Sequence, residues 1–249
     1  MARWRWGDGY GAGTGVIVPA RPHLPGCACC GPAPIGRRQV LQGLAAGGAL
    51  AALSACTTNP ATGRQSYTGF YSLKDDIKLG REEHPKLVKE FGGPYEHGKL
   101  NGYVTSVGKR LAAHSEHPEL PYSFTILDTP IVNAFALPGG YVHVSRGLLA
   151  LASNEAELAG VLAHEIGHVN ARHTAERLAA AQAAQFGLLL GSIGAAAAGL
   201  PSQVMDVGQT VATLAIQGYS RQQEMEADML GVRYMSQAGY DPNAMVSFL

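Results

Sequence analysis

The chain has few cysteines, no net charge and no long apolar run, and each absence excludes a class of protein. Its four cysteines all lie within the first 56 residues. The rest of the chain therefore has neither a disulfide framework nor a structural zinc site built from thiolates. Equal numbers of basic and acidic residues, 19 of each, argue against nucleic acid as a partner. The apolar runs over 40–53 and 186–200 fall short of the ~20 residues that span a bilayer.

A His-Glu-x-x-His pentapeptide, His164–His168, lies inside a segment with helical signals. Two histidines four residues apart share one face of a helix, so both imidazoles can reach one metal ion. Glu165, between them, can take a proton from a water beside that metal, which is the arrangement of a zinc metalloprotease. The alternative is a helix that carries two histidines by chance.

Segment 154–173 is expected to form a largely buried helix around this pentapeptide. Ser153 or Asn154 can cap its start, and apolar residues recur along it at helical spacing. Buried histidines and a buried glutamate need partners, and a metal ion satisfies all three. Gly167 costs roughly 1 kcal/mol against alanine inside a helix, which favours close packing of another element there.

A catalytic zinc usually has three protein ligands, so a third ligand is expected on another element. The candidate is Glu224, which shares a helix face with Asp228, four residues further on. Asp228 can accept a hydrogen bond from the second ring nitrogen of a ligand histidine and so fix its tautomer. From the residues alone, Glu226 is equally eligible, and the segment also fits an ordinary charged helix face.

The upstream part predicts more helices and a small sheet. Residues 73–120 fit two or three helices with a break at Gly92–Pro94, and residues 121–128 fit a strand. Segments 133–137 and 141–144 fit two strands joined by a Pro-Gly-Gly turn. The exposed edge of such a hairpin can bind an extended peptide through its backbone, or the hairpin can be purely structural.

Taken together, these motifs resemble those of the M48 metallopeptidases. The family pattern is His-Glu-x-x-His followed by a later Glu-x-x-x-Asp, and His164–His168 and Glu224–Asp228 match it. The match extends through Asn133–Leu148 and Gly239–Pro242, so the resemblance covers roughly Leu100–Leu249. Within the family the chain is most similar to periplasmic lipoprotein-type members of outer-membrane quality control, which carry a helical repeat domain after the peptidase.

The resemblance implies an α+β fold of the zincin type, mostly helical, with a small β-sheet whose edge strand binds substrate. It implies one Zn²⁺ per subunit, held by His164, His168 and Glu224. It also implies that Glu165 is the general base and that Asp228 supports a ligand histidine.

Other contacts at this site stay open. Arg221, Tyr219 and His173 are candidates for a second donor to the oxyanion that develops on the substrate. His173 follows His168 by five residues, which is off the ligand face of a continuous helix, so we interpret it as a capping or surface histidine. Substrate contacts are expected from the first strand of the hairpin, at Asn133, Ala134 and Phe135.

The start of the chain predicts export. Residues 1–36 are interpreted as a disordered or mis-called extension, and we assign no functional role to their cysteines, Cys27, Cys29 and Cys30. Residues 37–56 fit a twin-arginine-like lipoprotein signal peptide, with Cys56 as the lipidated residue, or else an uncleaved anchor. Residues 57–72 are expected to be a polar tether and 73–249 a peptidase domain truncated at its C-terminus. Residues 186–200 are expected to form a buried or interfacial helix, or a lid.

These features predict a zinc metalloendopeptidase that hydrolyses misfolded or unassembled cell-envelope proteins. We expect a periplasmic lipoprotein of a bacterial envelope, anchored at Cys56, with the outer membrane as the favoured location. The alternative is a lipid-anchored chaperone or outer-membrane assembly factor with a latent zinc site. A prenyl-protein protease also fits the family, but it needs several membrane spans.

Overall fold

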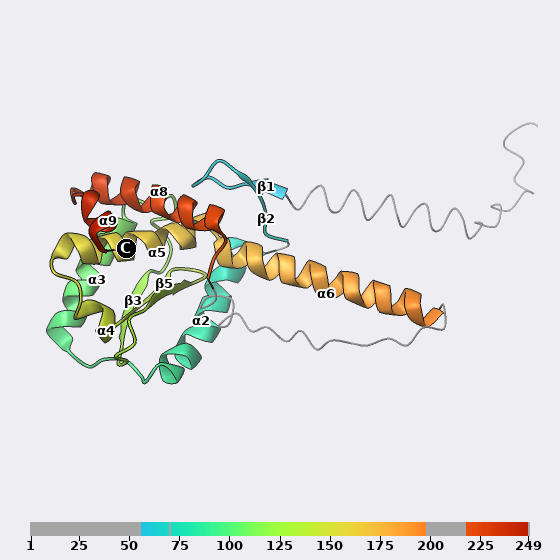
Figure 1. Ribbon diagram of the computed structural model, residues 1–249, viewed down its shortest axis with the longest axis horizontal. Coiled ribbons are helices and arrows are strands. Elements are labelled where there is room, and N and C mark those ends of the chain that lie inside the picture. Colours follow the sequence, from blue (N-terminus) through green and yellow to red (C-terminus); the bar gives the residue numbers. More distant parts are fainter. Residues whose placement is uncertain (1–55, 70, 198–217, 249) are drawn as a thin grey trace, which may run out of the picture. The chain divides into compact units, whose positions relative to one another are not determined.

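The structure, a computed structural model, describes residues 56–69, 71–197 and 218–248 (Figure 1). All of them belong to the second of two compact units, residues 47–249. The interpretations made for residues 1–55 lie outside the described residues. The elements in chain order are β1 (Cys56–Thr58), β2 (Gln65–Tyr67), α2 (Leu73–Glu90), α3 (Gly98–Ala112), β3 (Ser123–Leu127), β4 (Ala134–Leu137), β5 (Tyr141–Ser145), α4 (Arg146–Leu149), α5 (Glu155–Ala171), α6 (His173–Ala197), α8 (Arg221–Ala238) and α9 (Asn243–Phe248).

A three-stranded mixed sheet forms the β part of this α+β fold, in the order β3-β5-β4. β3 runs parallel to β5, and β4 pairs with β5 in antiparallel register, with Phe135 opposite His143. Gly139 and Gly140, in the turn between β4 and β5, have φ angles of +78° and +98°, a region that glycine enters without steric cost. The expected strands and their Pro-Gly-Gly turn are therefore confirmed.

The two faces of this sheet contact different helices because side chains alternate along a strand. Ala136, Val142 and Val144 join the main core with residues of α3 and α5. Phe135 and Leu137 face the other way and pack with α2. The sheet thus lies between α5 and α2 (Figure 1).

The expected break between the first two helices is also present. α2 starts at a capping box formed by Ser72 and Asp75 and ends at Glu90. Gly92 and Gly93 then have φ angles of +88° and +89°, which turns the chain before α3 begins. Local capping and glycine signals thus explain both ends of α2.

α5 and α8 pack closely at a glycine of the central pentapeptide, as its small residue predicted. A Cβ atom at Gly167 would lie 2.8 Å from the carbonyl oxygen of Ala227 in α8. From α8, Gly231 approaches the backbone of His164 in the same way, at 3.2 Å from its nitrogen. The backbones therefore come near enough for side chains of both helices to converge, and the two helices lie side by side in Figure 1.

The expected polar tether is instead partly folded, which corrects the boundary at residue 73. β1 and β2 form an antiparallel hairpin, and Asn59, Ser66 and Thr68 are buried. The Asn59 side-chain amide donates to the carbonyl oxygen of Ala171 at 2.8 Å, at the end of α5. Residues before α2 are thus part of the folded unit.

The helix expected over 186–200 exists as the later part of α6, which runs to Ala197. Of its alternatives, a buried helix is contradicted at the two residues of that range whose side chains are described, because Phe186 is 61% exposed and Gly187 is exposed as well. The interfacial helix and the lid stay predictions. Residues 198–200 lie outside the described part. None of the helices described combines the length and the hydropathy needed to cross a bilayer.

A pair of histidines, His143 fully buried and His84 half-buried, joins α2 to the sheet. Nδ1 of His84 and Nε2 of His143 are 2.9 Å apart, and the His143 ring stacks on Phe135. Within the described residues, Nδ1 of His143 has no hydrogen-bond partner. Burial, reinforced by the neighbouring His84, lowers the pKa of His143 to about 3. The folded protein therefore holds this ring in its neutral form.

We expect this pair to make the fold acid-sensitive. The pKa of His143 is about 3 in the folded state and 6.5 for a histidine exposed to water, so the unfolded chain binds more protons between those values. The stabilisation is complete above pH 6.5 and is lost as pH falls. The free energy of unfolding should drop by about 2 kcal/mol between pH 7 and pH 5 through this group. Urea unfolding of metal-free protein at both pH values measures it. An equal drop in His143→Gln would contradict the assignment.

Candidate metal centre

Three side chains from α5 and α8 converge on one point. Nε2 of His164 lies 3.0 Å from Nε2 of His168 and 3.4 Å from Oε2 of Glu224. The ligand atoms of all three residues lie within 4.8 Å of one another. Over the residues that the structure describes, no other group of three or more His, Cys, Asp or Glu side chains has such spacing. The predicted ligand set is thus brought together.

Asp228 sets the orientation of the first histidine. Its Oδ1 lies 2.9 Å from Nδ1 of His164, so that nitrogen carries a proton and donates it. Nε2 of a neutral His164 ring then offers a lone pair to the point of convergence. This is the role expected for Asp228, one helical turn after Glu224 on α8.

The second histidine is held by His173, which corrects the interpretation of His173 as a capping or surface residue. His173 is 0% exposed, and its Nδ1 lies 2.8 Å from Nδ1 of His168. Its Nε2 lies 3.1 Å from Oε2 of Glu226, which requires a proton on that nitrogen. In a neutral His173 ring, Nδ1 is therefore an acceptor, and His168 donates to it.

A left-handed residue explains why His173 can reach His168. Arg172 caps α5 with φ +56°, so the helix stops and the chain turns before α6. The Arg172 side chain donates from Nε to Asp76 at 2.6 Å and from Nη2 to the carbonyl oxygen of Tyr71 at 2.7 Å. Those contacts hold a conformation that is uncommon outside glycine. Because the helix is interrupted at Arg172, the spacing of a continuous helix does not determine where His173 lies relative to His168.

The converging atoms are all acceptors, which is the chemistry of a cation site. Burial and nearby positive charge lower the pKa of His168 well below 6.5, so its ring is neutral. Its Nε2 lies 3.0 Å from Nε2 of His164, and both nitrogens lie beside the carboxylate of Glu224. Two imidazoles and one carboxylate are a ligand set that fits zinc with a position left open.

Glu165 lies where α5 meets the edge strand of the sheet. Its carboxylate is buried and accepts a hydrogen bond from the backbone of Ala136 in β4. Burial raises the pKa of Glu165 to about 7, and the carboxylate of Glu224 adds to that rise. The side chain is thus a carboxyl group poised to exchange a proton near neutral pH.

Of the three candidates for an oxyanion donor, His173 has both ring nitrogens engaged by His168 and Glu226, and the other two differ in their surroundings. Tyr219 stacks on the ring of His168 with centroids 3.9 Å apart, and its hydroxyl lies 3.1 Å from Oγ1 of Thr174. Burial raises the pKa of Tyr219 to about 12. Arg221 is the exposed first residue of α8. The Tyr219 ring therefore supports His168 directly, whereas Arg221 lies on the surface of the same segment.

The expected substrate-contact residues lie at the edge of the sheet. β4 pairs with β5 alone among the described strands, so its other edge has no strand partner there. Asn133 extends the pairing, since its N–H donates to Oγ of Ser145 at 3.1 Å and its carbonyl oxygen accepts from the Ser145 N–H. The Phe135 side chain is 4% exposed and packs towards α2. Phe135 can therefore meet a substrate only through its backbone, and Ala134 is half-buried beside it.

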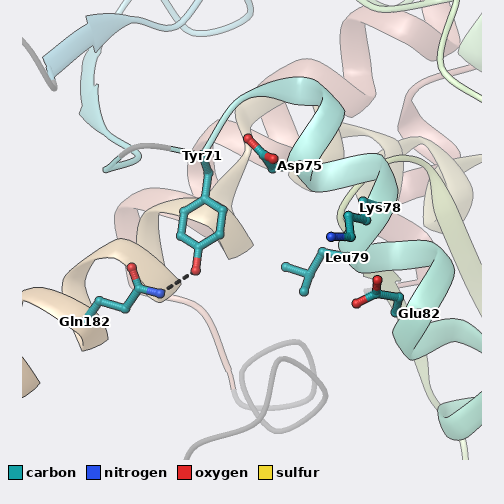
Figure 2. A pocket seen from close by; sticks show the side chains of 6 residues that line it. All are labelled: Tyr71, Asp75, Lys78, Leu79, Glu82 and Gln182. Atoms are coloured by element: carbon teal, nitrogen blue, oxygen red, sulfur yellow. Dashed lines mark hydrogen bonds between the residues drawn. The ribbon is translucent and has the colours of Figure 1, made fainter.

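An open pocket of about 330 Å³ lies away from this centre, between α2 and α6 (Figure 2). Gln182 donates to the Tyr71 hydroxyl across it. The acidic and basic side chains on its α2 wall balance partly, and it contains no histidine or cysteine. The residues that line it are Tyr71, Asp75, Lys78, Leu79, Glu82 and Gln182. The candidate site is therefore identified by its cluster of metal-binding side chains and not by the size of a cavity.

Comparison with known proteins agrees with this geometry. Residues 98–249 match the family model described as peptidase family M48. The chain is 39% identical over 155 residues to a putative beta-barrel assembly-enhancing protease of Vibrio cholerae, covering 60% of this chain and 32% of that protein. It is 33% identical over 155 residues to the beta-barrel assembly-enhancing protease of Escherichia coli K12, again covering 60% of this chain and 32% of that protein. A mitochondrial metalloendopeptidase OMA1 of Schizosaccharomyces pombe is 34% identical over 177 residues, covering 70% and 50%. The match thus spans a third to a half of these relatives.

Proposed function

The chain belongs to peptidase family M48, and on that premise we propose that it is a zinc-dependent endopeptidase. The observation that carries the proposal is the convergence of the ligand atoms of His164, His168 and Glu224, with Glu165 alongside on α5. A structural zinc site is normally closed by four protein ligands, often cysteines. Within the described residues three ligand groups converge, and an acid–base group stands beside them, which favours catalysis.

The residues divide the chemistry of peptide hydrolysis. His164, His168 and Glu224 would hold a zinc ion, which would supply Lewis-acid chemistry by lowering the pKa of a water and polarising a carbonyl oxygen. Glu165 takes a proton from the attacking water and passes it to the departing amine. Asp228 keeps His164 in the tautomer that binds metal through Nε2. Tyr219 and Arg221 remain the candidates for donating a hydrogen bond to the substrate oxyanion.

The substrate is proposed to bind as an added strand along β4. The backbone of Ala136 contacts Glu165, so a peptide paired with the free edge of β4 would pass beside the acid–base group. Backbone pairing tolerates many side chains, which suits unfolded segments of varied sequence. The relatives' names include beta-barrel assembly-enhancing proteases, which supports misfolded or unassembled envelope proteins as substrates.

The proposed location is the periplasmic side of a bacterial envelope, with a lipid at Cys56. The support is the sequence pattern that ends at Cys56 and the bacterial relatives of this chain. The backbone of Cys56 starts β1, at the edge of the folded unit. A lipid there would hold the peptidase close to a membrane surface.

Zinc removal tests the proposed activity. A chelator should abolish cleavage of unfolded casein by the full chain, and about one equivalent of zinc per chain should restore it, because the described residues contain one three-ligand cluster. Bound zinc should also raise the midpoint of thermal unfolding, since the ion binds the folded state. Zinc binding without any cleavage would instead favour the chaperone or assembly-factor alternative. Cleavage that persists without metal would contradict the proposal.

A further inference from the structure

The hairpin at the start of the folded unit contacts the helices that hold the metal centre. Its loop is fixed by Asn59, whose side chain donates to the carbonyl oxygen of Ala171 and accepts from the N–H of Ala61. Ala171 is the last residue of α5, three residues after His168. The loop is thereby attached to the end of the ligand helix.

Arg64, just before β2, extends from this loop between two other helices. Its Nε donates to Oε1 of Glu226 at 2.7 Å, and its Nη2 lies 3.2 Å from Oε2 of the same carboxylate. Nη2 also donates to Glu176 of α6 at 3.0 Å. The two parallel bonds to Glu226 are the fork geometry that arginine forms with carboxylates, which fixes orientation as well as charge.

The carboxylate that Arg64 holds is the one that holds His173. Oε2 of Glu226 accepts from Nε2 of His173, and His173 in turn accepts from His168. Hydrogen bonds therefore run without a break from Arg64 through Glu226 and His173 to His168. Each member except Arg64 is buried.

The two ligand histidines are thus supported differently. His164 has a carboxylate of its own, Asp228, whose side chain is 50% exposed. The Nδ1 atom of His168 instead reaches a carboxylate through a second imidazole, that of His173, and this carboxylate, Glu226, lies in the interior. A buried carboxylate needs a cation and hydrogen bonds to remain in place, and Arg64 supplies both.

We propose that Arg64 is a positioning residue of the metal centre, which fixes the His168 ring through Glu226 and His173. The inference rests on the proposed zinc site, and it extends that site to the β1–β2 hairpin, which begins at Cys56. A purely structural role would be limited to attaching the hairpin. The difference is measurable, because attachment alone leaves the affinity for zinc unchanged.

The test is zinc affinity, measured by chelator competition on the full chain. Arg64→Met should bind zinc about tenfold or more weakly, in the range typical for groups that orient metal ligands. Its kcat should fall while KM stays near the wild-type value, because the substrate edge is untouched. Arg64→Lys keeps the positive charge but cannot form the two parallel bonds to Glu226. Its zinc affinity should lie between those of the wild type and Arg64→Met, and it provides a variant that folds if Arg64→Met does not.

Two controls separate positioning from attachment. Asn59→Ala loosens the hairpin without touching Glu226, and Arg233→Met removes an ion pair to Glu116 elsewhere on α8. Both should lower the free energy of unfolding and leave zinc affinity unchanged. In a Glu226→Gln background, Arg64→Met should have no further effect on zinc affinity, because its route to His168 is already broken.

Zinc affinity of Arg64→Met and Arg64→Lys within twofold of wild type would overturn the inference. So would an equal loss of zinc affinity in Asn59→Ala. Failure of the proposed peptidase activity is a separate result: the wild type would then bind zinc but cleave nothing. The loss of zinc affinity on replacing Arg64 would still be seen in that case.

Discussion

Glu165→Gln should lower kcat for peptide cleavage by about 100-fold or more while the protein still binds zinc. The carboxylate is buried between α5 and β4 and accepts from the backbone of Ala136. Glutamine has nearly the same shape, and its amide oxygen can accept the same hydrogen bond. It cannot take up a proton from water, so the acid–base step is lost and the ligand residues remain.

The measurement pairs casein cleavage with zinc content at equal protein concentration. Glu157→Gln is the matched control, because Glu157 lies in the first turn of the same helix, is half-buried and is hydrogen-bonded to Asn154 rather than facing the metal centre. That variant should cleave at the wild-type rate. Undiminished cleavage by Glu165→Gln would exclude Glu165 as the general base. Loss of zinc together with activity would indicate a structural role for it.

Gly167→Val should destabilise the fold by about 3 kcal/mol and weaken zinc binding in the same protein. A Cβ atom at Gly167 would lie 2.8 Å from the carbonyl oxygen and 3.1 Å from the Cα atom of Ala227. Backbone atoms cannot move aside as a flexible side chain would, so α8 must shift away from α5. Glu224 and Asp228 flank Ala227 on α8, and they would move with it.

Gly102→Val is the control for this variant. Gly102 is exposed inside α3, and nothing lies within 4 Å of a Cβ atom placed there. Its free energy of unfolding should change by less than about 0.5 kcal/mol, as at ordinary surface positions. Urea unfolding and chelator competition measure the two effects. A Gly167→Val protein as stable as Gly102→Val would show that the contact between α5 and α8 is not tight.

Much of the fold was predictable because its signals are local. The Pro-Gly-Gly turn, the glycines after α2 and the capping residues all act within a few positions of the elements that they end. The pentapeptide was also predictable, because metal chemistry restricts both residue type and spacing. These signals need no knowledge of the rest of the chain. Glu224 and Asp228 were singled out only with the family resemblance, since Glu226 is equally eligible from the residues alone.

The support of His168 was not predictable, because it depends on contacts between distant residues. Arg172 takes a left-handed conformation without being glycine, and its side-chain partner Asp76 is 96 positions away. Arg64 and Glu226 are 162 positions apart. The hairpin that carries Arg64 has strands of only three residues and no apolar alternation, so it resembles a polar tether. The hairpin is held in the folded unit by hydrogen bonds from the side-chain amide of Asn59 to backbone carbonyl oxygens of α5.

α5 is enclosed on almost every side, since its buried residues run from Leu158 to Ala171 with His164 alone only partly covered. An ordinary amphipathic helix such as α3 keeps an exposed face, where substitutions can accumulate at little cost. α5 has no such face. A substitution along the helix that carries the pentapeptide therefore alters its packing against α8, α3 or the sheet, so nearly every position of this helix is tied to the geometry of the metal centre.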